Sequence, residues 1–275
     1  MTNLAFIGNK EFDKVTLITG GSKGIGEGCA RIFCAAGASV VICARGREAG
    51  EILAAELTAH GPGTCDFEQC DVTKPEDIKR VIGRTVARHG RLDCLINNAG
   101  WHPPFRTIDE FSIEEFVDLL QLNLVSVFAG CKFALPHLRE SNGSIINISS
   151  LVGAMGQKCA ATYCATKGGI NALTKALAVD EAHHGVRVNA VLPGNIRTPM
   201  AMAKIAKAEN PRALEELIDS WQWSGRRGTI EECGYACLFL ASDGASFITG
   251  VELIVSGGAE LAYGRKAPWR PGMEY

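Results

Sequence analysis

Short β-branched runs alternate with longer segments of helical spacing along most of the chain, and this alternation constrains the fold more than any other feature. Strands that are separated by helices pair in parallel through right-handed crossovers. Runs such as Val40-Val41-Ile42 are apolar on both faces, which is typical of strands covered by helices on each side. We therefore predict an α/β fold with a doubly wound parallel sheet, whose strands are 15–19, 39–43, 67–70, 94–97, 144–149, 187–192 and 253–255.

No linker, repeat or low-complexity tract interrupts this pattern, so we predict a single domain over 1–275. Two segments depart from the alternation. Segment 198–223 follows a Pro-Gly turn, is predicted to be helical, and lies where a lid over a site would be expected. The tail 264–275 contains two prolines and mixed charge, and we expect it to be either frayed or docked on a neighbouring subunit. The segments with helical spacing are 25–36, 75–88, 113–135 and 160–181.

The net charge of −2 gives no long-range reason to expect nucleic acid or a membrane surface as a partner. The eleven cysteines lie mostly in apolar stretches, are odd in number and follow no secretory signal, which favours free thiols in the cytosol. No stretch approaches the roughly 18 apolar residues of a membrane span. Neither the pair Cys233 and Cys237 nor the pair His183 and His184 has metal-site spacing, so we expect no metal.

A glycine-rich turn directly follows the first predicted strand and opens a helix. In this arrangement backbone N–H groups and the helix N-terminus hold a pyrophosphate, and glycines are needed because a Cβ would block the close approach of phosphate. Many such turns are purely structural, but the position in the first strand–helix unit favours dinucleotide binding. The candidate contacts are Gly20, Ser22, Lys23, Gly24, Ile25 and Gly26.

The end of the second predicted strand favours NADP(H). An Asp or Glu at that point would bind the ribose 2′-hydroxyl and favour NAD(H), but the sequence has Ala44 and Arg45, with no carboxylate before Glu48. A guanidinium can make bidentate contacts to a 2′-phosphate, and Lys23 adds a second positive charge. If Arg45 and Lys23 are merely solvated surface cations, NAD(H) is the alternative cofactor.

Tyr163 and Lys167 are four residues apart in a predicted helix, so their side chains share one face. A free phenol has a pKa near about 10, and an adjacent ammonium lowers that pKa by stabilising the phenolate. Alone, this pattern also fits an ordinary surface pair. Ser150 supplies context, because it ends a buried strand where open α/β sheets bind ligands and can hydrogen-bond a substrate oxygen. Ser149 points to the other side and is expected to be structural.

These elements together resemble the short-chain dehydrogenase/reductase family. The likeness extends to Asn97-Asn98-Ala99-Gly100, to Asn123 and to Pro193-Gly194-Asn195-Ile196-Arg197-Thr198, in the family's order and over nearly the whole chain. It implies a single-domain Rossmann fold with a seven-stranded parallel sheet of order 3-2-1-4-5-6-7. It also implies an oxidoreductase that transfers a hydride between NAD(P)(H) and a secondary alcohol or ketone, and a homotetramer joined by paired helices and the C-terminal strand.

The resemblance assigns a role to each matching residue. Tyr163 would exchange the proton, and Lys167 would lower the pKa of that phenol and bind the nicotinamide ribose. Ser150 would polarise the substrate oxygen, and Asn123 would hold the water that links Lys167 to solvent. The remaining contacts to the dinucleotide would come from Asp71 and Val72 at the adenine, Asn98, Ala99 and Gly100 near the ribose, and Pro193, Gly194, Ile196 and Thr198 at the nicotinamide.

Within the family, His102-Pro103-Pro104 and segments 148–157 and 257–261 resemble dehydrogenases of steroid 17β-hydroxyls. The resemblance implies a small-molecule substrate of the estradiol/estrone type, with a sugar such as L-fucose as the alternative. Those enzymes carry an acid where Ala44 stands in this chain and prefer NAD, so this departure bears on the cofactor.

His102 and Gln157 follow strands at the ligand-binding edge and are candidates to line the substrate pocket, although His102 could equally bond local backbone. Trp221 and Trp223 are expected to pack within the lid rather than to stack on substrate. A non-enzymatic alternative is a catalytically silent dinucleotide sensor. The complete set of catalytic residues disfavours this alternative, because a sensor needs only the binding residues.

Overall fold

The computed structural model describes residues 12–262, which contain one seven-stranded parallel sheet. Its order is β3-β2-β1-β4-β5-β6-β7, so the predicted sheet and the strand order implied by the family resemblance are both confirmed. The edge strand β3 begins three residues earlier than predicted. The strands are β1 Val15–Thr19, β2 Ser39–Ala44, β3 Thr64–Gln69, β4 Cys94–Asn97, β5 Ser144–Ile148, β6 Arg187–Pro193 and β7 Glu252–Val255.

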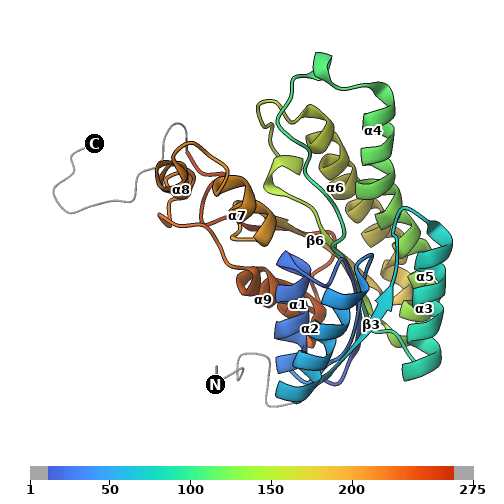
Figure 1. The fold of residues 1–275 in the computed structure, drawn as a ribbon. Helices are drawn as coiled ribbons and strands as arrows, with labels where there is room; N and C mark the ends of the chain where they lie inside the picture. The colour runs from blue at the N-terminus through green and yellow to red at the C-terminus, as the bar shows by residue number, and fades with distance from the viewer. Residues whose placement is uncertain (1–11, 263–275) are drawn as a thin grey trace.

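Helices cover both faces of the sheet (Figure 1). One apolar core lies between the sheet and α1 (Gly24–Ala35), α2 (Arg47–His60) and α9 (Ile230–Ala241). The other lies between the sheet and α3 (Pro75–His89), α5 (Ser126–Ser141) and α6 (Ala161–Glu181). The strands β1, β4 and β5 are buried throughout, which explains their continuous apolar character in the sequence.

The segment 113–135, predicted as one helix, is a composite. Helix α4 (Ile113–Leu120) begins at a capping box formed by Ser112 and Glu115, and a π-helical turn, Gln121–Val125, joins it to α5. The prediction failed here because apolar periodicity reports which face is buried and does not reveal one extra residue in a turn. The continuous stretch Ile113–Ser141 is long and apolar enough to be a candidate membrane span. Half of its apolar 18-residue window is buried inside the protein, however, as in a core helix.

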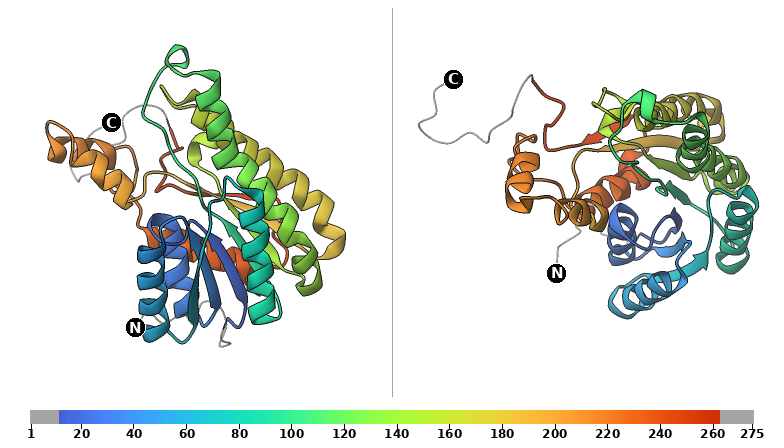
Figure 2. Two further views of the ribbon diagram at one scale, coloured as in Figure 1. Left: turned by 45° about the vertical axis from the view of Figure 1, so that its right-hand side comes forward. Right: turned by 45° about the horizontal axis from the view of Figure 1, so that its top comes forward.

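The predicted lid, 198–223, consists of two short helices instead of one helical segment. Helix α7 (Pro199–Ile205) is capped by Thr198 and α8 (Pro211–Asp219) by Asn210, and each has proline at its first position. The two helices lie together to one side of the sheet, away from α3 and α5 (Figures 1 and 2). The tail 264–275 lies outside the described residues.

Candidate active site

The glycine turn has the geometry of a phosphate cradle. It runs from the end of β1 to the start of α1, with Gly20 and Gly24 at φ values of +64° and +61°. A Cβ at Gly26 would lie 2.4 Å from the carbonyl oxygen of Gly20, so the turn packs directly on the helix. No side chain caps α1, and the exposed Lys23 stands at its N-cap position. The first N–H groups of α1 are therefore available to an anion.

Asn98 holds this turn in place. Its amide nitrogen donates to the carbonyl oxygens of Thr19 (2.9 Å) and Gly20 (3.0 Å). The Thr19 hydroxyl accepts in turn from the backbone N–H groups of Asn98 (3.0 Å) and Ala99 (3.1 Å). Both N–H donors of the Asn98 side chain are engaged by the turn, and the ribose contact that the family resemblance implies stays a prediction for its amide oxygen. Thr19 is a positioning residue that the sequence analysis did not single out.

Arg45 and Asp71 lie beside each other at the edge of the sheet. They line a cavity of about 630 Å³ that also includes Lys74, whereas Val72 is buried beneath the surface. Asp71 accepts from the backbone N–H (3.1 Å) and the hydroxyl (2.8 Å) of Thr73. Neither the Arg45 guanidinium nor the Lys23 ammonium forms an ion pair within residues 12–262. Arg45 is thus available at this cavity and Lys23 at the N-terminus of α1.

Tyr163 and Lys167 share one face of α6, as their spacing predicts, and the Lys167 Nζ atom lies 5.8 Å from the centroid of the phenol ring. Lys167 is buried, and Nζ donates to the carbonyl oxygen of Ile148 at 2.8 Å. An ammonium has three N–H donors, so the buried cation has capacity for further partners. The ribose hydroxyls of a dinucleotide fit this requirement.

The pKa of the phenol departs from the sequence-based prediction. We expected Lys167 to depress it, but burial raises the pKa of Tyr163 to about 12, while a hydrogen bond to the Ser150 side chain acts in the opposite direction. Burial also lowers the pKa of Lys167 to about 8. Both shifts have one physical cause, because removing water disfavours the charged form of each group. In the protein alone, desolvation outweighs the attraction between the two side chains.

Ser150 and Ser149 take different roles. Ser150 is half-buried, caps the short turn Leu151–Gly153, and has its hydroxyl next to Tyr163. The Ser149 hydroxyl donates instead to the carbonyl oxygen of Lys167 at 3.1 Å, inside the core. Ser150 is therefore the serine that can reach a substrate oxygen.

Asn123 lies in the π-helical turn between α4 and α5 and is completely buried. Its Oδ1 atom accepts from the Trp101 N–H (2.9 Å), and its Nδ2 atom donates to the Trp101 carbonyl (2.9 Å) and to the Thr166 hydroxyl (3.2 Å). Both amide N–H donors are used, so the side chain shapes the site, and the water expected at Asn123 stays a prediction. Thr166 is a further residue that sequence reasoning missed, and its spacing from Tyr163 is the only sequence signal for it.

His102 and Gln157 meet beside the catalytic phenol. The rings of His102 and Tyr163 have centroids 4.3 Å apart, and His102 Nε2 lies 3.3 Å from Gln157 Oε1. The other ring nitrogen, Nδ1, lies 2.6 Å from the carbonyl oxygen of Pro103. The alternative that His102 bonds local backbone is therefore observed, and its role in substrate binding stays a prediction.

The segment after β6 closes the site on the side of the glycine turn. Pro193 ends β6 and Gly194 follows it, while the Thr198 side chain lies near Gly24, where a Cβ would be 3.6 Å from the Thr198 Cγ2 atom. Ile196 is buried and pairs with Gly228. This arrangement brings Ile196 and Thr198 to the start of α1, where the resemblance implies nicotinamide contacts.

A buried arginine anchors helix α8 of the segment predicted to be a lid. Arg227 is 2 % exposed, its Nε atom donates to Asp219 at 2.8 Å, and its Nη2 atom pairs with Glu215 on the same helix, α8. Trp223 donates from its indole nitrogen to the carbonyl oxygen of Leu261 at 3.1 Å, but both Trp221 and Trp223 are exposed, so their expected packing within the lid is not observed in this structure. Arg227 was not singled out from the sequence, because a lone arginine in a loop gives no sign of its burial.

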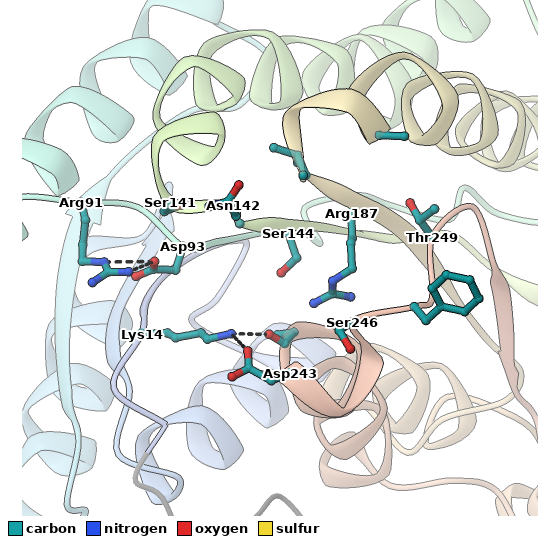
Figure 3. A pocket seen from close by; sticks show the side chains of 16 residues that line it. Lys14, Arg91, Asp93, Ser141, Asn142, Ser144, Arg187, Asp243, Ser246 and Thr249 are labelled. Atoms are coloured by element: carbon teal, nitrogen blue, oxygen red, sulfur yellow. Dashed lines mark hydrogen bonds and ion pairs between the residues drawn. The ribbon is translucent and has the colours of Figure 1, made fainter.

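A second cavity, of about 640 Å³, opens at the opposite edge of the sheet, where β1, β4, β5 and β6 begin (Figure 3). Its cations already have partners. Lys14 pairs with Asp243 (2.9 Å), Arg91 with Asp93 (2.6 Å), and Arg187 donates to the carbonyl of Leu240 at the end of α9 (2.6 Å). These charges offset carbonyl groups at helix C-termini, and none of the predicted site residues lines this cavity. We therefore assign it a structural role.

No group of three His, Cys, Asp or Glu side chains suited to a metal ion occurs in the described part of the chain. The eleven cysteines are all free thiols.

Comparison with known proteins agrees with this geometry. A family model described as "Enoyl-(Acyl carrier protein) reductase" matches residues 20–260. The L-fucose dehydrogenase of Bos taurus is 49% identical over 261 residues, which cover 95% of this chain and 94% of that protein. The 3beta-hydroxysteroid dehydrogenase 1 of Eggerthella lenta is 38% identical over 250 residues, 90% of this chain and 94% of that protein. The crystal structure of levodione reductase superimposes with a TM-score of 0.88 at 31% identity, covering 92% of this chain and 100% of that one.

Proposed function

The chain belongs to the short-chain dehydrogenase/reductase family and is an NAD(P)-dependent oxidoreductase acting on an alcohol/ketone couple, and we propose that its substrate is a sugar of the L-fucose type. The sequence resemblance led us to expect a 17β-hydroxysteroid first and L-fucose second. The comparisons favour the second, because L-fucose dehydrogenases from several mammals are 49–50% identical to this chain.

The observation that carries the sugar proposal is the His102–Gln157 pair beside Tyr163. A neutral His102 directs its one N–H at the Pro103 carbonyl and keeps Nε2 as an acceptor, while the Gln157 carboxamide has both donors and an acceptor. Two such groups can bind hydroxyls next to the one being oxidised, and a site built to hydrogen-bond hydroxyls discriminates strongly against substrates that lack them. A 17β-hydroxysteroid of the estradiol type is the second candidate substrate. The 38% identical 3beta-hydroxysteroid dehydrogenase supports a steroid substrate.

In this mechanism Tyr163 takes the proton from the substrate hydroxyl, and Ser150 hydrogen-bonds the same oxygen. The bound dinucleotide supplies the hydride acceptor and, in its oxidised form, a positive charge next to the phenol. That charge and the Lys167 ammonium together oppose the burial that holds the phenol neutral in the protein alone. We infer that the pKa of Tyr163 depends on whether the dinucleotide is bound.

NADP(H) is the proposed cofactor, and its support is two cations that form no ion pair within residues 12–262, Lys23 at the glycine turn and Arg45 after β2. The geometry of the glycine turn is compatible with both NADP(H) and NAD(H). The cytosolic location and the homotetramer expected from the sequence and its family likeness stay predictions.

Initial rates with L-fucose and with estradiol, each with NAD⁺ and NADP⁺, test the proposal. We expect turnover of L-fucose and a higher kcat/KM with NADP⁺. Faster turnover of estradiol would favour the steroid reading, and a failure to oxidise either alcohol would remove the support for both substrates.

A further inference from the structure

Thr166 occupies a buried position between two residues of the site. It lies one helical turn after Tyr163 in α6 and has no exposed surface. Its hydroxyl donates to the carbonyl oxygen of Tyr163 at 2.8 Å and accepts from the Asn123 amide at 3.2 Å. The hydroxyl therefore uses both its donor and an acceptor site, which a methyl group in the same place could not do.

The hydrogen bonds continue from Asn123 to the loop after β4. Asn123 bonds both the N–H and the carbonyl of Trp101, each at 2.9 Å, and Trp101 directly precedes His102. The π-helical turn that carries Asn123 also packs on α6, because a Cβ at Gly169 would lie 2.8 Å from the Leu124 side chain. A continuous set of hydrogen bonds thus links the His102 loop, the π-helical turn and the turn of α6 that carries Tyr163.

We propose that Thr166 is a positioning residue, whose hydroxyl fixes the π-helical turn and the His102 loop relative to Tyr163. The inference rests on the proposed function for its kinetic consequence but not for its structural one. Without the hydroxyl, a buried amide donor of Asn123 has no partner, which disfavours the observed arrangement. We therefore expect Asn123 to shift toward another partner, together with the His102 loop that it holds. A displacement of about 1 Å at such a site can lower the rate of the chemical step about 100-fold.

The same helix contains a control with matching chemistry. Thr174 also has no exposed surface, and its hydroxyl donates to the carbonyl of Ile170 (2.8 Å) and accepts from the amide of Asn147 (2.9 Å). The Asn147 Oδ1 atom accepts from the Asn97 amide at 2.9 Å in the core, near the ends of β5 and β4, and within the described residues no hydrogen bond joins either side chain to Trp101 or His102. Replacing Thr174 therefore removes the same kinds of hydrogen bond from α6 without touching the His102 loop.

The test compares Thr166→Val with Thr174→Val and with Thr166→Ser, which keeps the hydroxyl. Hydrogen exchange of the peptide that spans residues 99–104 is measured by mass spectrometry, together with kcat and the KM for the dinucleotide. We expect Thr166→Val to speed exchange at the Trp101 amide and to lower kcat by about 10- to 100-fold, with KM for the dinucleotide changed less than about twofold. Thr166→Ser should keep exchange at Trp101 and kcat near the wild-type values. Thr174→Val should also leave exchange at Trp101 and kcat unchanged, although it lowers the melting temperature by about as much as Thr166→Val does.

The positioning role is overturned if Thr166→Val and Thr174→Val reduce kcat equally, or if exchange at Trp101 is unchanged in Thr166→Val. Should Thr166→Val not fold, Thr166→Cys takes its place, because a thiol of similar size is a weaker donor and acceptor. Its exchange and kcat are expected to lie between those of the wild type and the predicted Thr166→Val values, and wild-type values for both would overturn the role. If the wild type oxidises no alcohol, the proposed function fails, while the exchange comparison still decides the role of Thr166.

Discussion

The imidazole ring of His102 lies against the phenol ring of Tyr163, with centroids 4.3 Å apart and an angle of 44° between the ring planes. The contact joins the loop after β4 to the catalytic helix and places a polar ring at the wall of the pocket. His102 also contacts Gln157, so the two residues proposed to bind substrate lie beside the proposed proton-transfer group.

We expect His102→Phe to separate these two tasks. The ring contact with Tyr163 is retained, but the hydrogen-bonding nitrogens are lost, so binding of a polyhydroxylated substrate weakens. A lost hydrogen bond of about 1 to 2 kcal/mol corresponds to a roughly 5- to 30-fold rise in KM for L-fucose. Steady-state kinetics measure this rise, with the affinity for the dinucleotide as the unaffected control. An unchanged KM for L-fucose would place its hydroxyls elsewhere.

Tyr163→Phe should abolish turnover and spare dinucleotide binding. Removing the hydroxyl takes away the proton acceptor, and general acid–base catalysis contributes about 10²- to 10⁴-fold to rates. The change leaves the ring that packs on His102 in place. Rates are compared with the binding of the reduced dinucleotide, followed by nicotinamide fluorescence. Turnover at the wild-type rate would exclude the mechanism proposed for Tyr163.

Lys167→Met should remove activity but stabilise the fold near neutral pH. Burial lowers the pKa of Lys167 from 10.5 to about 8, so at pH 7 the folded protein holds an unfavourably buried cation. A difference of that size corresponds to about 3 kcal/mol at most, which the variant would recover. As pH rises above 8, wild-type Lys167 loses its proton in the folded state and the advantage of the variant should shrink. Urea unfolding of both proteins between pH 6 and pH 9.5 measures this, and a constant difference would contradict it.

Arg45→Ala should change cofactor selectivity without affecting the fold. The Arg45 side chain is exposed, and its loss removes a charge-assisted contact worth about 1.5 to 3 kcal/mol to a 2′-phosphate. We expect NADPH affinity to fall about tenfold or more, with NADH affinity unchanged. Arg47→Ala is the control, because Arg47 lines the same cavity but already pairs with Glu51 at 3.1 Å. Equal or tighter binding of NADH than of NADPH to the wild type would refute the assignment.

Arg227→Met should loosen the lid. It removes the buried cation of Asp219 and Glu215, which keep only the exposed Arg197 at 3.4 Å and 3.7 Å, so we expect a loss of about 1 to 3 kcal/mol. Arg212→Met provides the comparison, since Arg212 pairs with Glu216 on the same helix but is exposed to solvent, where a pair contributes less than about 1 kcal/mol. Chemical unfolding gives both values. Similar small losses in the two variants would show that the lid does not depend on Arg227.

The strands and most helices could be predicted because their signal is local. Leu17, Leu95 and Ile145 are neighbours across three strands, and each lies in an apolar run whose burial on both faces is visible in the sequence. The catalytic pair was equally accessible, because a spacing of four residues in a helix fixes a shared face. The π-helical turn was not, since Asn123 reaches its position only through partners on Trp101 and Thr166.

The sequence alone determined the doubly wound sheet, the glycine turn and the set of catalytic side chains, because hydrophobic periodicity and glycine conformation act within a few residues of one another. Only the tertiary structure decided that Asn98 holds the glycine turn, that Thr166 joins Asn123 to the Tyr163 helix, and that burial raises the pKa of the phenol. Hydrogen-bond partners and desolvation depend on residues far apart in the chain, and they exist only once the core has excluded water.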